Sequence, residues 1–171
     1  ATSMKAPAYL AINPMGKVPA LVHDGRVVTE VPAIITYLAE VFPQAGLGGQ
    51  DRAAFLRWMF FGAGPLEYAI VNRALGVEVP PEKAGFVGYG SYDRTLDALE
   101  SALTARDWLA GDAFSGVDLY IGSQLGYGLH FGTIPARPAF TAYWARMQDR
   151  PARLRAVATD DALLEKAMTD G

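Results

Sequence analysis

The fold is determined largely by residues 12–43, INPMGKVPALVHDGRVVTEVPAIITYLAEVFP. Two β-branched runs in this stretch, residues 18–22 and 26–29, are separated by a short link that ends in Asp24-Gly25. Aspartate followed by glycine between two such runs predicts a β-hairpin, because both residues tolerate the positive φ angles of a two-residue turn. We therefore expect a two-stranded antiparallel sheet here.

A short amphipathic helix is expected after the hairpin. Its apolar residues repeat at helical spacing along one face and are Val31, Ile34, Ile35, Leu38 and Phe42. Pro32 suits the first helical position, where a missing N–H costs nothing. The glycine-rich residues 46–49 then read as a linker. We expect one domain over residues 1–45 and an all-helical second domain over residues 51–171.

The pattern after residue 51 is helical throughout. Residues 52–75 are apolar around much of the helix and are interrupted at 62–65 by Gly-Ala-Gly-Pro, which predicts a kink. Leucines at helical spacing over residues 92–103 predict a surface helix with one buried stripe. Residues 119–129 carry no charge, so we expect that helix to be buried on all sides.

The start of the short helix is a candidate binding site. If Pro32 is the first helical residue, Val31 is the N-cap, and valine offers no acceptor to the exposed helix amides. The free amides would bind a ligand carboxylate, and the neighbouring Glu30 would bind a ligand ammonium group. In the alternative interpretation, which the residues alone favour, Thr29 or Glu30 caps the helix and no ligand is involved.

Pro19 opens the first strand and raises a similar question. A cis bond before Pro19 would expose the backbone N–H and C=O of Val18 to an extended ligand lying alongside. Only about 5% of such bonds in folded proteins are cis, so general chemistry favours trans.

A second motif, Phe114-Ser115-Gly116-Val117-Asp118-Leu119, marks the start of the uncharged helix. Ser115 and Asp118 have the spacing of a capping box, in which each side chain accepts a hydrogen bond from the other residue's backbone N–H. We assign Ser115 and Asp118 to structure rather than to chemistry.

Composition argues against several functional classes. The net charge is −3 and no long basic run is present, so no nucleic-acid partner is expected. No apolar stretch is long enough to cross a bilayer, and the chain does not start with a secretory signal. It has no cysteine, and no carboxylate–histidine spacing is typical of a metal site. A cytoplasmic protein without a metal is the expectation.

Taken together, residues 12–43 resemble the second half of the amino-terminal, thioredoxin-like domain of the cytosolic glutathione transferases, of the bacterial type. GDAFSGVDLYIGS, residues 111–123, resembles the start of the buried helix in their helical domain. The resemblance implies an α+β, mostly α protein: a partial thioredoxin-like domain, made of a β-hairpin plus helix, followed by an all-α bundle. It also implies a homodimer joined through the short helix and the first two long helices.

The resemblance implies a site for glutathione as co-substrate. The proline matching Pro19 is cis in that family, and the residue matching Val18 pairs its backbone with the cysteinyl part of glutathione. The positions matching Glu30 and Val31 hold the γ-glutamyl end, and Lys17 matches a position that can reach the glycyl carboxylate. The family usually has serine where this chain has Val31, a loss of one hydrogen bond worth about 1.5–3 kcal/mol.

The implied activity is conjugation or transfer of glutathione to a hydrophobic electrophile, and the alternative is a non-catalytic binding or assembly module. Four aromatic residues are guesses for the electrophile pocket: Phe61, Tyr89, Tyr92 and Tyr127. The family's activating serine, tyrosine or cysteine follows a first strand that precedes the segment starting here. The catalytic residue is therefore unknown, and we expect the natural protein to possess those elements or a partner chain to replace them.

Overall fold

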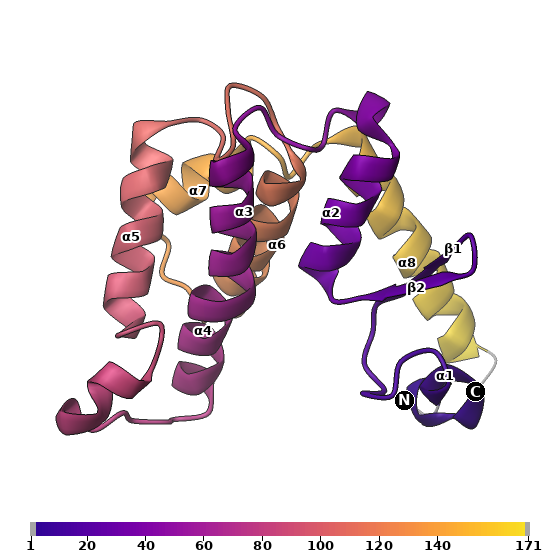
Figure 1. Ribbon diagram of the computed structural model, residues 1–171, viewed down its shortest axis with the longest axis horizontal. Coiled ribbons are helices and arrows are strands. Elements are labelled where there is room, and N and C mark those ends of the chain that lie inside the picture. The colour runs from indigo at the N-terminus through magenta and orange to yellow at the C-terminus, as the bar shows by residue number, and fades with distance from the viewer. Residues whose placement is uncertain (1–2, 170–171) are drawn as a thin grey trace.

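The computed structural model describes residues 3–169 and has two halves (Figure 1). The first half contains a 3-10 turn Ser3–Lys5, α1 (Pro7–Leu10), β1 (Ala20–His23), β2 (Arg26–Thr29), α2 (Val31–Val41) and a second 3-10 turn Pro43–Ala45. The second half contains α3 (Arg52–Phe61), a π-helical segment Gly62–Leu66, α4 (Glu67–Ala74), a 3-10 helix Pro81–Phe86, α5 (Tyr92–Ala105), α6 (Gly116–Phe131) and α7 (Pro138–Ala145). The last helix, α8 (Pro151–Thr169), follows these in sequence but lies on the side of the hairpin and α1 in Figure 1. No helix within residues 3–169 is long and apolar enough to span a membrane.

The predicted hairpin is confirmed. β1 and β2 pair antiparallel, and the pair His23 and Arg26 closes a two-residue turn. Asp24 has φ 49° and Gly25 has φ 74°, the positive angles that the Asp-Gly signal predicts. The first strand begins at Ala20 rather than at residue 18, so the segment before it is a loop.

The helix α2 begins one residue earlier than predicted. Val31 is the first helical residue and Glu30 is the N-cap, with φ 70° and ψ 121°. The expectation that Val31 is the N-cap is therefore wrong. Proline lacks only an N–H that the first turn leaves unpaired in any case, so Pro32 fits the second helical position as well as the first.

The interruption predicted at residues 62–65 takes the form of a π-helical segment. Residues 62–66 adopt this wider turn and contain Pro65, between α3 and α4. Gly62 permits close packing there, because a Cβ at this position would lie 2.7 Å from Cε1 of Tyr120 on α6. The segment thus brings α6 directly against the α3–α4 helix.

The core lies in the helical half. The predicted leucine stripe of α5 is confirmed, because Leu96, Leu99 and Leu103 are buried. They pack in one cluster with buried residues of α3, α6 and α7, which include Phe55, Trp58, Ile121, Leu125, Phe140 and Tyr143.

The expectation that α6 is buried on all sides is wrong. Leu119, Tyr127 and Phe131 are 41%, 70% and 67% exposed and follow one another along one side of the helix. Absence of charge does not force burial, since apolar atoms make up more than half of an ordinary protein surface. The opposite side of α6 is buried as expected.

The start of α6 joins the two halves. A Cβ at Gly116 would lie 2.5 Å from Cγ2 of Ile35, so α2 packs on α6 at a position that only glycine allows. The N–H of Gly116 also donates to the carbonyl of Leu47 in the linker, at 2.8 Å. This contact sets the distance between α2 and the helical bundle.

Candidate functional site

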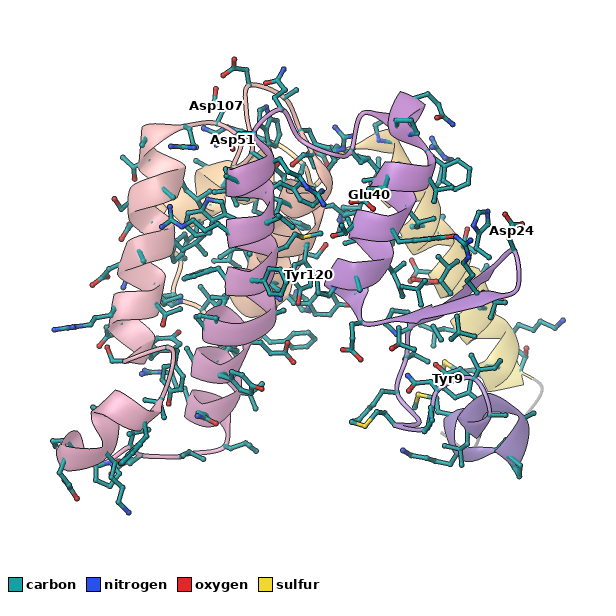
Figure 2. The ribbon with its side chains drawn as sticks, in the orientation of Figure 1. Tyr9, Asp24, Glu40, Asp51, Asp107 and Tyr120 are labelled. Carbon is teal, nitrogen blue, oxygen red and sulfur yellow. The ribbon has the colours of Figure 1, made fainter. Side chains whose placement is uncertain are left out.

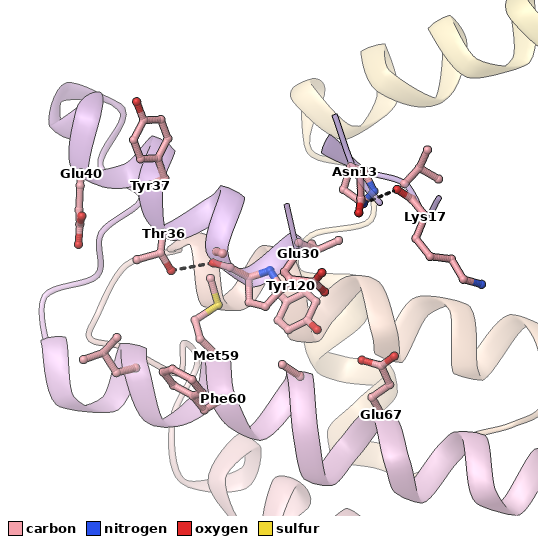
Figure 3. Close-up of a pocket in the computed structure, with 17 residues that line it drawn as sticks. Asn13, Lys17, Glu30, Thr36, Tyr37, Glu40, Met59, Phe60, Glu67 and Tyr120 are labelled. Atoms are coloured by element: carbon pink, nitrogen blue, oxygen red, sulfur yellow. Dashed lines mark hydrogen bonds between the residues drawn. The ribbon is translucent and has the colours of Figure 1, made fainter. Parts of the chain in front are cut away.

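A cavity of about 850 Å³ lies between α2 and the α3–π–α4 helix. Figure 3 shows its walls, which come from the loop before β1, the start of α2 and its face towards α3, and one side of the helical half. All five residues predicted from sequence to bind a ligand line it: Lys17, Val18, Pro19, Glu30 and Val31. The structure therefore brings together two segments that sequence reasoning treated separately.

The loop wall consists of residues 17–19. The peptide bond between Val18 and Pro19 is cis. Val18 is 62% exposed and is therefore accessible to a ligand. Asn13 is buried beneath this loop, and its Nδ2 donates to the carbonyl of Lys17 at 2.8 Å (Figure 3).

The second wall is the start of α2. Within the described part of the chain, the Glu30 side chain makes no capping hydrogen bond, so the first amides of α2 have no side-chain acceptor at the N-cap. Their partial positive charge favours an anion, while the exposed Glu30 carboxylate favours a cation. Glu30 is also one of two non-glycine residues with positive φ among residues 3–169. Such strained residues cluster at functional sites.

The facing wall is mostly apolar and comes from α3, the π-helical segment, α4 and α6. Leu56, Met59 and Phe60 extend from α3, Glu67 lies at the start of α4, and Tyr120 extends from α6. Tyr120 lies between the helical half and α2 (Figure 2). Sequence reasoning assigned none of these residues to the site.

Tyr120 is a titratable group of this wall, and its surroundings change its pKa. Burial raises the pKa of its phenol to about 12, and the negative charge of Glu67 adds to the effect. Tyr120 is therefore a neutral hydrogen-bond donor at every physiological pH.

An ion pair beside the cavity connects the two halves through Glu40, which lines the cavity. Arg52 of α3 donates to the Glu40 carboxylate of α2 at 2.7 Å. Both side chains are about half exposed, so this pair contributes little to stability.

The four aromatic residues guessed for the second pocket lie elsewhere. Phe61 packs edge-on against Trp58, with ring centroids 5.0 Å apart. Tyr89 and Tyr92 line a separate cavity of about 420 Å³ between α4 and α5. Tyr127 is exposed and stacks on Phe131.

Known proteins resemble both halves of this chain. A family model described as the glutathione S-transferase N-terminal domain matches residues 1–41, and the corresponding C-terminal model matches residues 89–151. Glutathione S-transferase GST-4.5 of Xanthomonas campestris is 32% identical over 158 residues, which cover 86% of this chain and 77% of that protein. The chain belongs to the glutathione S-transferase family.

Other members of the family are similar to this chain over most of its length. The maleylacetoacetate isomerase of Pseudomonas aeruginosa is 34% identical over 176 residues, covering 86% of this chain and 81% of that enzyme. A sphingomonad glutathione S-transferase, solved in complex with glutathione, has 34% identity and a TM-score of 0.72. That match covers 92% of this chain and 80% of the solved one. The expected α+β, mostly helical glutathione-transferase fold is thereby confirmed.

Proposed function

We propose that this glutathione S-transferase binds glutathione between residues 17–19 and the start of α2 and adds its thiol to a hydrophobic electrophile held against the helical half. One observation supports this proposal. Glu30, the uncapped amides of α2 and the loop of residues 17–19 all line the same cavity. A related transferase that has been solved with glutathione supports it independently.

The charges of the cavity suit the ends of the tripeptide. Glutathione carries an ammonium and a carboxylate at its γ-glutamyl end and a second carboxylate at its glycyl end. In the proposed pose Glu30 accepts from the ammonium, the backbone amide of Val31 donates to the γ-glutamyl carboxylate, and Lys17 pairs with the glycyl carboxylate. The backbone of Val18 pairs with the cysteinyl residue as a neighbouring strand would.

We place the binding site for the electrophile at the facing wall of the cavity, rather than at the four aromatic residues expected from sequence. Met59 and Phe60 supply apolar surface, and the neutral Tyr120 phenol donates a hydrogen bond to an oxygen of the electrophile. Glu67 places a negative charge at the edge of this half, so neutral or cationic electrophiles suit it better than anionic ones.

A direct test is calorimetric titration of the purified chain with glutathione, followed by a conjugation assay with an aryl halide. Saturable binding with turnover is the expected result, and absence of binding would contradict the proposal. Binding without turnover would favour the non-catalytic alternative, which the relatives do not favour.

We also propose that the chain forms a homodimer through α2, the α3–α4 helix and α5. Two large aliphatic residues of the α3–α4 region that lie outside the cavity are exposed in the single chain: Val71 and Leu75. An interface would cover such residues. Equilibrium sedimentation is expected to give twice the chain mass of 18.4 kDa, and a value at that mass would rule the dimer out.

A further inference from the structure

Three side chains from the start of the chain converge on three consecutive backbone carbonyls. Lys5, Tyr9 and Asn13 are spaced four residues apart, on α1 and the turns that flank it. The acceptors are the carbonyls of Met15, Gly16 and Lys17. We call this set of six residues the carbonyl clamp.

The donors of the carbonyl clamp are within good hydrogen-bonding distance. Lys5 Nζ lies 3.3 Å from the carbonyl oxygen of Met15 and 3.0 Å from that of Gly16. The Tyr9 hydroxyl lies 2.6 Å from the carbonyl oxygen of Lys17, and Asn13 Nδ2 lies 2.8 Å from the same atom. Two donors occupy both lone pairs of the Lys17 carbonyl. These hydrogen bonds fix the orientation of the peptide between Lys17 and Val18.

Gly16 allows this close approach. Its φ of 59° lies in the left-handed region, and a Cβ there would lie 2.7 Å from Lys5 Nζ. Asn13 is buried and also accepts the N–H of Met15 on its Oδ1 at 3.1 Å. The loop therefore rests directly on α1 and has no room to shift towards it.

The clamp ends where the proposed site begins. Lys17, Val18 and Pro19 line the cavity, whereas Lys5 and Tyr9 lie outside the set of described residues that line it. Figure 2 shows Tyr9 on α1, on the side of the molecule away from the helical bundle. Any effect of Tyr9 on a ligand in the cavity must pass through the Lys17 carbonyl.

We propose that Tyr9 is a positioning residue for glutathione, which it influences by holding the Lys17–Val18 peptide in the orientation that pairs with the cysteinyl backbone. This inference rests on the proposed function. Strand-like pairing needs the N–H and C=O of Val18 to point at the ligand, and a rotation of the preceding peptide would turn that N–H away. Pre-setting this orientation removes an ordering cost from binding.

Tyr9→Phe tests the proposal because it removes the donor and keeps the ring. The Kd and KM for glutathione are expected to rise about three- to tenfold, the effect of one lost hydrogen bond, with kcat and the KM for the electrophile unchanged. Tyr68→Phe, the same change at an exposed tyrosine of α4, is the matched control and is expected to change neither constant.

Amide hydrogen exchange over residues 15–18 of the unliganded chain gives a second readout that needs no ligand. Faster exchange in Tyr9→Phe than in the wild-type chain is expected. Unchanged exchange would overturn the clamp whatever the chain binds. Faster exchange with an unchanged Kd would limit Tyr9 to a structural role and overturn its assignment as a positioning residue. Failure of the wild-type chain to bind glutathione would instead overturn the proposed function, and the exchange result would still decide whether Tyr9 orders the loop.

Discussion

Replacing Asp118 by asparagine is expected to destabilise the fold by about 3–6 kcal/mol, because two charge-assisted hydrogen bonds of about 1.5–3 kcal/mol each are lost. The carboxylate is fully buried and accepts four hydrogen bonds. Its Oδ1 accepts the N–H of Leu109 at 2.8 Å and the hydroxyl of Tyr143 at 2.6 Å. Its Oδ2 accepts the N–H and hydroxyl of Ser115 at 2.8 and 2.7 Å.

The expected loss is large because asparagine keeps the volume but replaces one oxygen with a donor. That donor would face either the Ser115 pair or the pair formed by Leu109 and Tyr143, and leave two buried donors unpaired. Asp118 ties α6 to the loop after α5 and to α7, so its loss acts on three segments of the core at once.

Urea unfolding followed by circular dichroism measures the change. Tyr143→Phe, which removes one of the four bonds, is expected to cost less than half as much, and the exposed Asp161→Asn on α8 is expected to stay within about 0.5 kcal/mol of wild type. A loss below about 1 kcal/mol for Asp118→Asn would show that the network does not anchor α6.

The same network gives the stability a pH limit on the alkaline side. Burial, together with the adjacent Asp118, raises the pKa of Tyr143 above its usual value of 10.0. The unfolded chain would therefore release this proton at lower pH than the folded chain. The contribution of Tyr143 to stability is complete below about pH 10 and is lost as the pH rises further.

The elements predicted correctly are those whose signals are local. The hairpin follows from two residues that tolerate positive φ, and the π-helical break follows from Gly62 and Pro65 within an otherwise helical run. The start of α2 lies one residue before the predicted position, because Pro32 is equally acceptable at the first and second helical positions. No signal in the sequence separates those two positions.

The residues of the candidate site also differ in whether a local sequence signal predicts them. Lys17, Val18 and Pro19 are contiguous, and so are Glu30 and Val31, so each of these two parts of the cavity wall could be predicted from a short motif. The facing wall is assembled by tertiary packing. Leu56, Met59, Phe60 and Glu67 lie at helical spacing on one face of the α3–α4 helix, but that spacing does not show what the face lies against. Tyr120 reaches the cavity because Gly62, far away in sequence, has no side chain to exclude it. A single sequence carries no marker for such a contact.

Glu30→Gln is expected to weaken glutathione binding about ten- to a hundredfold and to leave the stability of the unliganded chain unchanged. The carboxylate is proposed to accept from the γ-glutamyl ammonium, and a hydrogen bond between two charged groups is worth more than one to a neutral amide. Glutamine is similar to glutamate in size and should adopt the same φ of 70°, so the free energy of unfolding is expected to stay the same. Calorimetric titration with glutathione gives the Kd, and thermal unfolding without ligand checks the stability.

Two further substitutions in the same cavity make the result specific to the ligand's ammonium. Glu67→Gln removes an equal charge from the facing wall and is expected to leave the Kd for glutathione within about twofold, because Glu67 is proposed to face the electrophile. Val31→Ser is expected to change affinity in the opposite direction, since a hydroxyl on the first residue of α2 adds a donor for the γ-glutamyl carboxylate. Equal losses for Glu30→Gln and Glu67→Gln would mean that the cavity attracts glutathione only through its overall charge, and the proposed pose would then be wrong. Weaker binding of glutathione by Glu30→Gln together with tighter binding by Val31→Ser would place the γ-glutamyl ammonium and carboxylate at the start of α2.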